Sequence, residues 1–140
     1  MPMIDVYIPE ELLPVDAAEA LGTELTFAVL RAEGHTEEAI PAIFTANTAA
    51  FVHRLPVVST AAAPRANAVR VQIITPPGSL NRAGQRQITA EATEIVAKLA
   101  PAATVWVILT EAAEGGWGIG GTAFGKEEFA ALAGQSSAQS

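Results

Sequence analysis

Apolar and polar residues follow the same order of patterns in each half of the chain. Residues 4–9 (IDVYIP) and residues 69–75 (VRVQIIT) each place apolar side chains at every second position, as expected for a β-strand with one buried face. Each strand is followed by apolar residues at helical spacing, over residues 18–32 and 88–99. A β-branched and aromatic stretch then completes each half, at residues 49–58 and 104–112. The pattern predicts the order βαβ twice.

The two halves also match position by position at an offset of 67 residues. Ile4 of the first predicted strand falls on Val71 of the third, and Leu21 of the first predicted helix falls on Ile88 of the second. We therefore predict one domain over residues 1–140, with an internal repeat of residues 1–58 and 68–133. The segment 59–67 (STAAAPRAN) is small and polar, which is typical of a connector.

Two βαβ units can join edge to edge as one α/β fold, a four-stranded sheet with both helices on one face. The opposite face then lacks a cover, which favours a homo-oligomer. Residues 115–121 (GGWGIGG) hold five glycines, which suits a tight hairpin near the C-terminus. We expect a short helix around Phe129 and Leu132, followed by a frayed tail.

Composition excludes several classes of function. The chain has a net charge of -7 and only eight scattered Lys and Arg residues, so it lacks the basic patch of a nucleic-acid-binding protein. Its two histidines show no zinc spacing and it has no cysteine, so we expect no metal site and no cofactor. No apolar stretch approaches the roughly 20 residues that span a bilayer, and no signal peptide is visible, so we expect a cytoplasmic protein without membrane contact.

Two motifs are distinctive. The chain begins MPMIDVYIP, and residues 105–121 read VWVILTEAAEGGWGIGG. With the doubled βαβ plan, they resemble the tautomerase superfamily, in particular the fused members that are twice the length of a 4-oxalocrotonate tautomerase subunit. The resemblance implies a trimer with its sheets around a central barrel, and an amino-terminal proline as the catalytic group.

Pro2 is therefore the candidate catalytic residue. Removal of Met1 would leave a secondary amine at the start of the first strand. An α-amino group titrates near ~8, and burial disfavours its charged form, so a buried amine can be neutral and accept a proton at neutral pH. The proline ring fixes the direction of the nitrogen lone pair. In an unrelated sequence, a proline at position 2 would simply favour removal of Met1. Because this chain also has the glycine-rich motif, we interpret Pro2 as a general base.

The substrate-binding residues expected from the resemblance are partly missing. Short tautomerases have one arginine in the loop after the first strand and another early in the later strand. The corresponding positions here hold Leu12 and Ser79 for the first arginine, and Ala49 and Trp106 for the second. A substrate carboxylate is best held by Arg. We therefore consider other side chains for substrate binding: Arg70, His53, Arg54, Trp106 and Trp117.

Each of these side chains also has a simpler interpretation. Trp117 occupies the position of the family's active-site aromatic residue, but it can equally pack against another subunit. Trp106 can be a core or interface residue. Arg70 is our first choice for a carboxylate, and its alternative is a solvated strand residue. His53 and Arg54, on the second predicted strand, are the remaining candidates.

The first hypothesis is an isomerase that tautomerises a small carbonyl or enol acid, with Pro2 as the base. One alternative is a dehalogenase, hydratase or decarboxylase of a small acid on the same fold. Another is a catalytically inactive trimeric scaffold, which the absent arginines favour. A third is a protein whose Pro2 amine acts as a nucleophile or in ligand binding.

Overall fold

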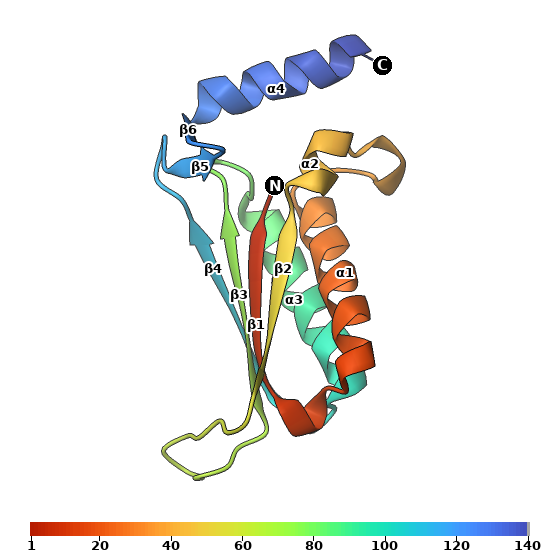
Figure 1. The fold of residues 1–140 in the computed structure, drawn as a ribbon, viewed down its shortest axis with the longest axis vertical. Helices are drawn as coiled ribbons and strands as arrows, with labels where there is room; N and C mark the ends of the chain where they lie inside the picture. The colour runs from red at the N-terminus through yellow and green to blue at the C-terminus, as the bar shows by residue number, and fades with distance from the viewer. Residues whose placement is uncertain (140) are drawn as a thin grey trace.

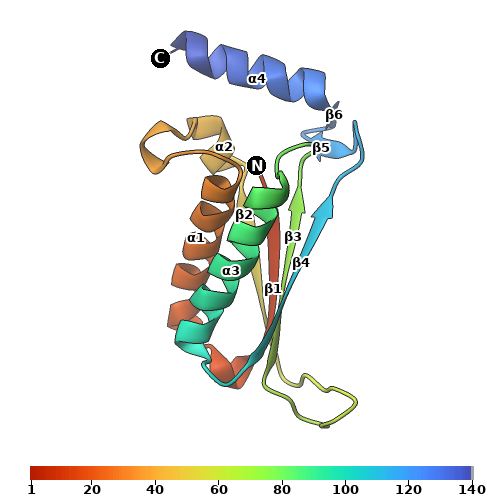
Figure 2. The same cartoon turned by 180° about the vertical axis from the view of Figure 1, so that it is seen from behind.

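The computed structural model describes residues 1–139 and consists of one mixed sheet covered on one side by two helices (Figures 1 and 2). The sheet has four strands in the order β2-β1-β3-β4. Strands β1 and β2 are parallel, β3 and β4 are parallel, and β1 pairs antiparallel with β3. The predicted fold class is confirmed: two βαβ units meet edge to edge at the β1–β3 pair.

The first unit contains β1 (Met3–Pro9), α1 (Val15–Ala32) and β2 (Ala49–Leu55). The strand β1 ends at Pro9, which cannot donate to a continuing ladder. The helix α1 begins after Pro14, and Gly34 adopts a φ of 100° just beyond its C-terminal end, where a residue with a Cβ would be strained. Three short helical segments complete this unit: η1 (Glu10–Leu12), η2 (Glu37–Ala39) and α2 (Ala42–Ala46).

The second unit contains β3 (Ala68–Thr75), α3 (Arg82–Leu99) and β4 (Thr104–Glu111). The Asn81 side chain caps the N-terminus of α3 by accepting a hydrogen bond of 2.8 Å from the Gly84 amide. Thr104, at the start of β4, donates its backbone N–H to the Asn67 carbonyl at 2.9 Å. The second unit thus repeats the plan of the first.

The core lies between the sheet and the two long helices. It is formed by the alternate strand residues that face the helices and by one stripe of each helix: Ile4, Val6, Ile8, Leu13, Leu21, Leu25, Ala28, Val29, Ala32, Val69, Val71, Ile73, Ile88, Ala92, Ile95 and Val96. The two helices approach closely at Gly84. A Cβ there would lie 2.5 Å from the Ala32 carbonyl oxygen, so this crossing requires glycine.

The C-terminal segment forms a hairpin and a helix at one end of the sheet (Figure 1). Strands β5 (Trp117–Ile119) and β6 (Thr122–Phe124) join through Gly120 and Gly121, whose φ values of 58° and 87° suit a tight hairpin turn. The following helix, α4 (Lys126–Gln139), is longer than the predicted short helix, and the expectation of a frayed tail over residues 134–139 was wrong. Alanine, lysine, glutamate and glutamine dominate that helix and favour helical backbone.

The face of the sheet away from the helices, the open face, has no cover within residues 1–139 and is turned toward the viewer in Figure 1. Three large apolar side chains on it are about half exposed: Phe51 on β2, and Trp106 and Ile108 on β4. No helix in the described part of the chain has the length and hydrophobicity needed to cross a membrane.

Candidate active site

Pro2 is buried at the end of the sheet where β1 begins. Its carbonyl oxygen accepts a hydrogen bond of 3.3 Å from the Ala49 amide, which ties it to the start of β2. Because β3 runs antiparallel to β1, the C-terminal ends of β3 and β4 lie at this same end. The β5–β6 hairpin follows β4, so the buried Trp117 also lies at this end of the molecule (Figures 1 and 2).

Met1 and Glu33 form an ion pair beside Pro2. The Met1 amino nitrogen lies 3.6 Å from Glu33 Oε1, and the Glu33 side chain is only 4% exposed. Among the described residues, Glu33 Oε1 is the one buried side-chain oxygen or nitrogen without a hydrogen-bond partner. We call Met1, Pro2, Glu33, His35 and Ser79 the N-terminal site.

Burial changes the titration of the N-terminal site. It lowers the pKa of the Met1 amino group, and the charge of Glu33 partly offsets that shift. It raises the pKa of the Glu33 carboxyl, while the N-terminal ammonium and a hydrogen bond from the Ser79 side chain act in the opposite direction. Burial, together with the N-terminal charge, also lowers the pKa of His35. The site therefore favours the neutral forms of its groups.

Glu33 was not among the site residues predicted from the sequence, although its spacing from the apolar residues of α1 indicates a buried position. Leu25 and Val29 lie on the buried stripe of α1, and one further step of four residues reaches Glu33. A carboxylate that continues an apolar stripe is unusual, because a buried charge needs a partner. The helical spacing of Glu33 from Leu25 and Val29, rather than a sequence motif, therefore indicates that Glu33 is buried.

Three of the predicted binding residues lie together in a row across the open face. The register places His53, Tyr7, Arg70 and Trp106 side by side on β2, β1, β3 and β4. The rings of His53 and Tyr7 stack with centroids 4.4 Å apart, and the Arg70 guanidinium lies 4.4 Å from the Tyr7 centroid on the same open face. His53 Nε2 also lies 2.7 Å from Asp5 Oδ1. We call the four side chains the open-face row.

The open-face row and the N-terminal site are separate within one subunit. Tyr7 lies five residues along β1 from Pro2, a distance of about 16 Å at the usual rise of a strand. Arg54, the other predicted cation, points to the helix side: its Nε donates to the Leu13 carbonyl at 2.8 Å and its Nη2 to the Glu10 carbonyl at 3.3 Å. Of the five predicted binding residues, only Trp117 lies at the same end of the sheet as Pro2.

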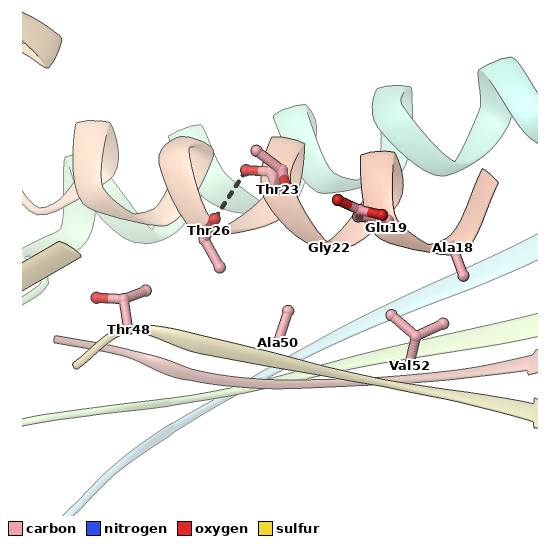
Figure 3. Close-up of a pocket in the computed structure, with 8 residues that line it drawn as sticks. All are labelled: Ala18, Glu19, Gly22, Thr23, Thr26, Thr48, Ala50 and Val52. Atoms are coloured by element: carbon pink, nitrogen blue, oxygen red, sulfur yellow. Dashed lines mark hydrogen bonds between the residues drawn. The ribbon is translucent and has the colours of Figure 1, made fainter. Parts of the chain in front are cut away.

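Two surface cavities lie apart from Pro2. A groove of about 440 Å³ lies between α1 and β2, with Thr23 and Thr26 on one wall and Thr48, Ala50 and Val52 on the other (Figure 3). Glu19 is the one titratable residue in its lining, so the groove lacks an acid and base pair. A second cavity, of about 280 Å³, is lined by parts of the open-face row and by residues of the 55–58 segment. Pro2 lines neither cavity.

No protein-family model and no curated protein matches this sequence. Solved structures do match it. A fused 4-OT protein that forms an asymmetric trimer has a TM-score of 0.69 at 20% identity, over 86% of this chain and 94% of its own. The chain has the fold of the fused 4-OT proteins. N1, a member of the cis-3-chloroacrylic acid dehalogenase family, has a similar fold, with a TM-score of 0.68 at 15% identity, over 97% of this chain and 99% of its own.

A macrophage migration inhibitory factor-like protein from Entamoeba histolytica also has a similar fold. Its TM-score is 0.70 at 12% identity, over 88% of this chain and 98% of its own. At such identities the likeness is one of backbone architecture, and any chemistry must come from the side chains of this chain. Within residues 1–139 no group of three or more His, Asp or Glu side chains is arranged to hold a metal ion.

Proposed function

We propose that this protein is a tautomerase-like isomerase whose general base is the amine of Pro2, freed by removal of Met1. The observation that carries the proposal is the burial of Pro2 at the end of the sheet, beside an amino terminus whose pKa is lowered by burial. A neutral secondary amine can take a proton from the carbon next to a substrate carbonyl. The resulting enolate takes a proton at its oxygen and becomes the enol, which completes a keto-enol tautomerisation.

The tautomerase fold supports this assignment because it supplies the position that the base requires. The hydrogen bond from Ala49 to the Pro2 carbonyl and the β1 ladder hold the proline ring in one orientation. A fixed base within reach of a substrate proton typically contributes about 10² to 10⁴ in rate. The resemblance suggested a 2-oxo or enol acid as substrate, and we retain a 2-oxo or enol compound as the proposed class.

We also propose that the protein works as a homotrimer. The half-exposed Phe51, Trp106 and Ile108 form an apolar surface on the open face that a second copy would cover. Fused 4-OT proteins of this fold form trimers. In such an assembly a neighbouring subunit can bring its own residues to the N-terminal site, and Trp117 or members of the open-face row remain candidates for that part.

The alternative reaction is dehalogenation or hydration of a small acid by the same amine. The fold of N1, from a dehalogenase family, favours it, as does the buried carboxyl of Glu33, a group that can orient a water molecule. An inactive scaffold is the remaining possibility. Assays with an enol and with a halogenated or unsaturated acid separate the three proposals.

Ketonisation of an enol tests the first proposal directly. Intact mass should show loss of Met1, and the processed protein should accelerate ketonisation of phenylenolpyruvate or of its methyl ester. Pro2→Ala retains an α-amine but loses the ring that fixes it, and we expect a loss of about 10²-fold in kcat/KM, the usual cost of a misplaced group. Pro64→Ala, in the exposed connector, is the matched control. Full activity in Pro2→Ala would reject the proposal.

A further inference from the structure

In the chain that retains Met1, this residue occupies the place of a substrate. The Met1 carbonyl carbon is bonded to the Pro2 nitrogen, so any compound that approaches that nitrogen after processing must enter the space that Met1 vacates. Met1 is itself buried, so that space lies inside the protein. The Met1 amino nitrogen is 3.6 Å from Glu33 Oε1, and the vacated space therefore extends to the Glu33 carboxyl.

Glu33 is in a place that disfavours a negative charge. Its side chain is 96% buried, and Oε1 has no hydrogen-bond partner within residues 1–139. It is the residue directly after α1, where the helix dipole presents its negative end. Burial raises the pKa of its carboxyl, which favours the protonated form that can donate a proton.

We infer that Glu33 is the second catalytic residue of the N-terminal site, the acid that protonates the substrate oxygen while Pro2 removes the proton from carbon. This inference rests on the function proposed above. An enolate oxygen requires a donor as its charge develops. Among the described residues, the Glu33 carboxyl is the buried titratable acid that reaches the vacated space.

The proton balance of the step closes within the pair. The neutral Pro2 amine takes the proton from the α-carbon and becomes an ammonium, while the electron pair of the broken C–H bond forms the C=C bond of the enol. The carbonyl oxygen takes the Glu33 proton, which leaves a carboxylate. Transfer of a proton from the ammonium to that carboxylate restores both groups. Ketonisation of an enol is the reverse sequence.

The charge of the site then selects the substrate. The Pro2 and Glu33 pair shares one proton and has no net charge, and His35 is kept neutral because its pKa is lowered. Arg31 is engaged by Glu37 at 2.7 Å and by Glu91 at 3.2 Å. A carboxylate substrate would therefore enter without a counterion from this subunit's end of α1.

Two further charges lie near the loop that contains Ser79. The Glu111 carboxylate accepts a hydrogen bond from the Gly78 amide, and the Lys126 side chain lies beside Gly78. These two opposite charges offset each other, the Glu114 carboxylate accepts a hydrogen bond of 2.7 Å from the Lys126 amide nearby, and the protein as a whole has a net charge of -7. We therefore assign an uncharged carbonyl or enol compound, rather than a carboxylic acid, as the preferred substrate.

The test uses the processed protein with two probes that differ only in charge, phenylenolpyruvate and its methyl ester. We expect kcat/KM for the ester to exceed that for the acid by at least about tenfold, the difference made by a modest repulsion of 1.4 kcal/mol. Glu33→Gln should lower kcat/KM for the ester by about 10²-fold, within the usual range for loss of an acid catalyst. Glu33→Asp should restore part of that loss.

The pH profile separates chemistry from structure. Ketonisation uses the Pro2 ammonium and the Glu33 carboxylate, so wild-type kcat/KM should rise and then fall with pH. The rise at low pH should disappear in Glu33→Gln, whose amide does not titrate, while the fall at high pH, caused by deprotonation of Pro2, should remain. The matched control is Glu38→Gln, at an exposed glutamate five residues away. It should keep the wild-type rate and profile. Circular dichroism checks that each variant is folded.

The outcomes distinguish this inference from the proposed function. If wild type is active, Pro2→Ala is weak, and Glu33→Gln keeps both the rate and the low-pH rise, the role of Glu33 is overturned while the Pro2 base survives. A preference for the acid over the ester overturns the assigned substrate class. If neither probe reacts with the processed wild type, the proposed function itself fails. A misfolded Glu33→Gln is replaced by Glu33→Asp, for which an unchanged profile and rate would again overturn the role.

Discussion

The N-terminal site and the open-face row place similar side chains in opposite surroundings. In the N-terminal site, the Glu33 carboxyl is buried and one of its oxygens lacks a hydrogen bond. In the row, His53 pairs with Asp5, and Arg70 lies over the Tyr7 ring, at positions open to solvent in the isolated subunit. Solvent and neighbours satisfy the charges of the row, whereas burial shifts the protonation of the N-terminal site. A charged side chain becomes a candidate for catalysis when its surroundings leave it unsatisfied.

The largest effect should come from blocking the terminus. A protein with a few residues fused before Met1 retains a tertiary amide at Pro2, and an amide nitrogen has no basic lone pair. We expect kcat/KM for ketonisation to fall by about 10² to 10⁴, the contribution of a general base. The control bears the same residues at the C-terminus. Equal activity of the two fusion proteins would show that the N-terminal site has no role in catalysis.

A charge on the open face should disrupt the proposed trimer. Ile108 is 45% exposed in the isolated chain and lies two residues along β4 from Trp106, in register with Gln72 of β3. Ile108→Glu would bury a carboxylate between subunits, and we expect the mass measured by light scattering to fall from that of a trimer to that of a monomer. Leu99→Glu, at an exposed position of α3, should remain trimeric. A trimeric Ile108→Glu would place the interface elsewhere.

A smaller effect is expected from Arg70. The Arg70 guanidinium belongs to the open-face row, about 16 Å from Pro2 along the strand, and charges separated by more than a screening length of about 10 Å interact weakly at 0.1 M salt. Arg70→Ala should therefore change kcat/KM for the ester by less than about threefold, as its neighbour Gln72→Ala should. A loss similar to that of Glu33→Gln would mean that Arg70 of a neighbouring subunit reaches the N-terminal site.

The smallest effect concerns stability. Asp5 and His53 form a pair that is partly exposed, at 26% and 40% of their side-chain surfaces. Such pairs contribute about 0.2 to 1 kcal/mol, so Asp5→Asn should lower the free energy of unfolding by no more than that. Chemical denaturation at neutral pH measures the change, with Asp16→Asn as the control. A loss of several kcal/mol would show that the row is buried in the assembly.

Much of the fold was predictable because each local pattern agreed with the tertiary structure. The alternation in β1 and β3, the glycine after α1 and the glycine-rich hairpin each have a local physical cause. The extent of α4 was underestimated, since its serines and glycine suggested a tail. Helix formers distributed among them outweighed that signal.

The candidate site was predictable only in part. Pro2 was identified from its place at the terminus, but the distance from Pro2 to Arg70 depends on the antiparallel register of β1 and β3. That register pairs Tyr7 with Arg70 and Met3 with Ile74, so Arg70 lies far along the strand. Long-range register is set by packing across the sheet and is not encoded in either strand alone. Glu33 was missed because helix ends are usually solvated, although its phase with Val29 pointed to the core.

The most direct test of the account is a titration of the Pro2 amine, followed by its nitrogen NMR signal in isotope-labelled, processed protein. We predict a pKa below the value near ~8 that is usual for an α-amino group, because burial disfavours the ammonium. Glu33→Gln should lower this pKa further, since it removes the one negative charge that stabilises the ammonium. An ordinary pKa that Glu33→Gln leaves unchanged would contradict both the buried base and its partner.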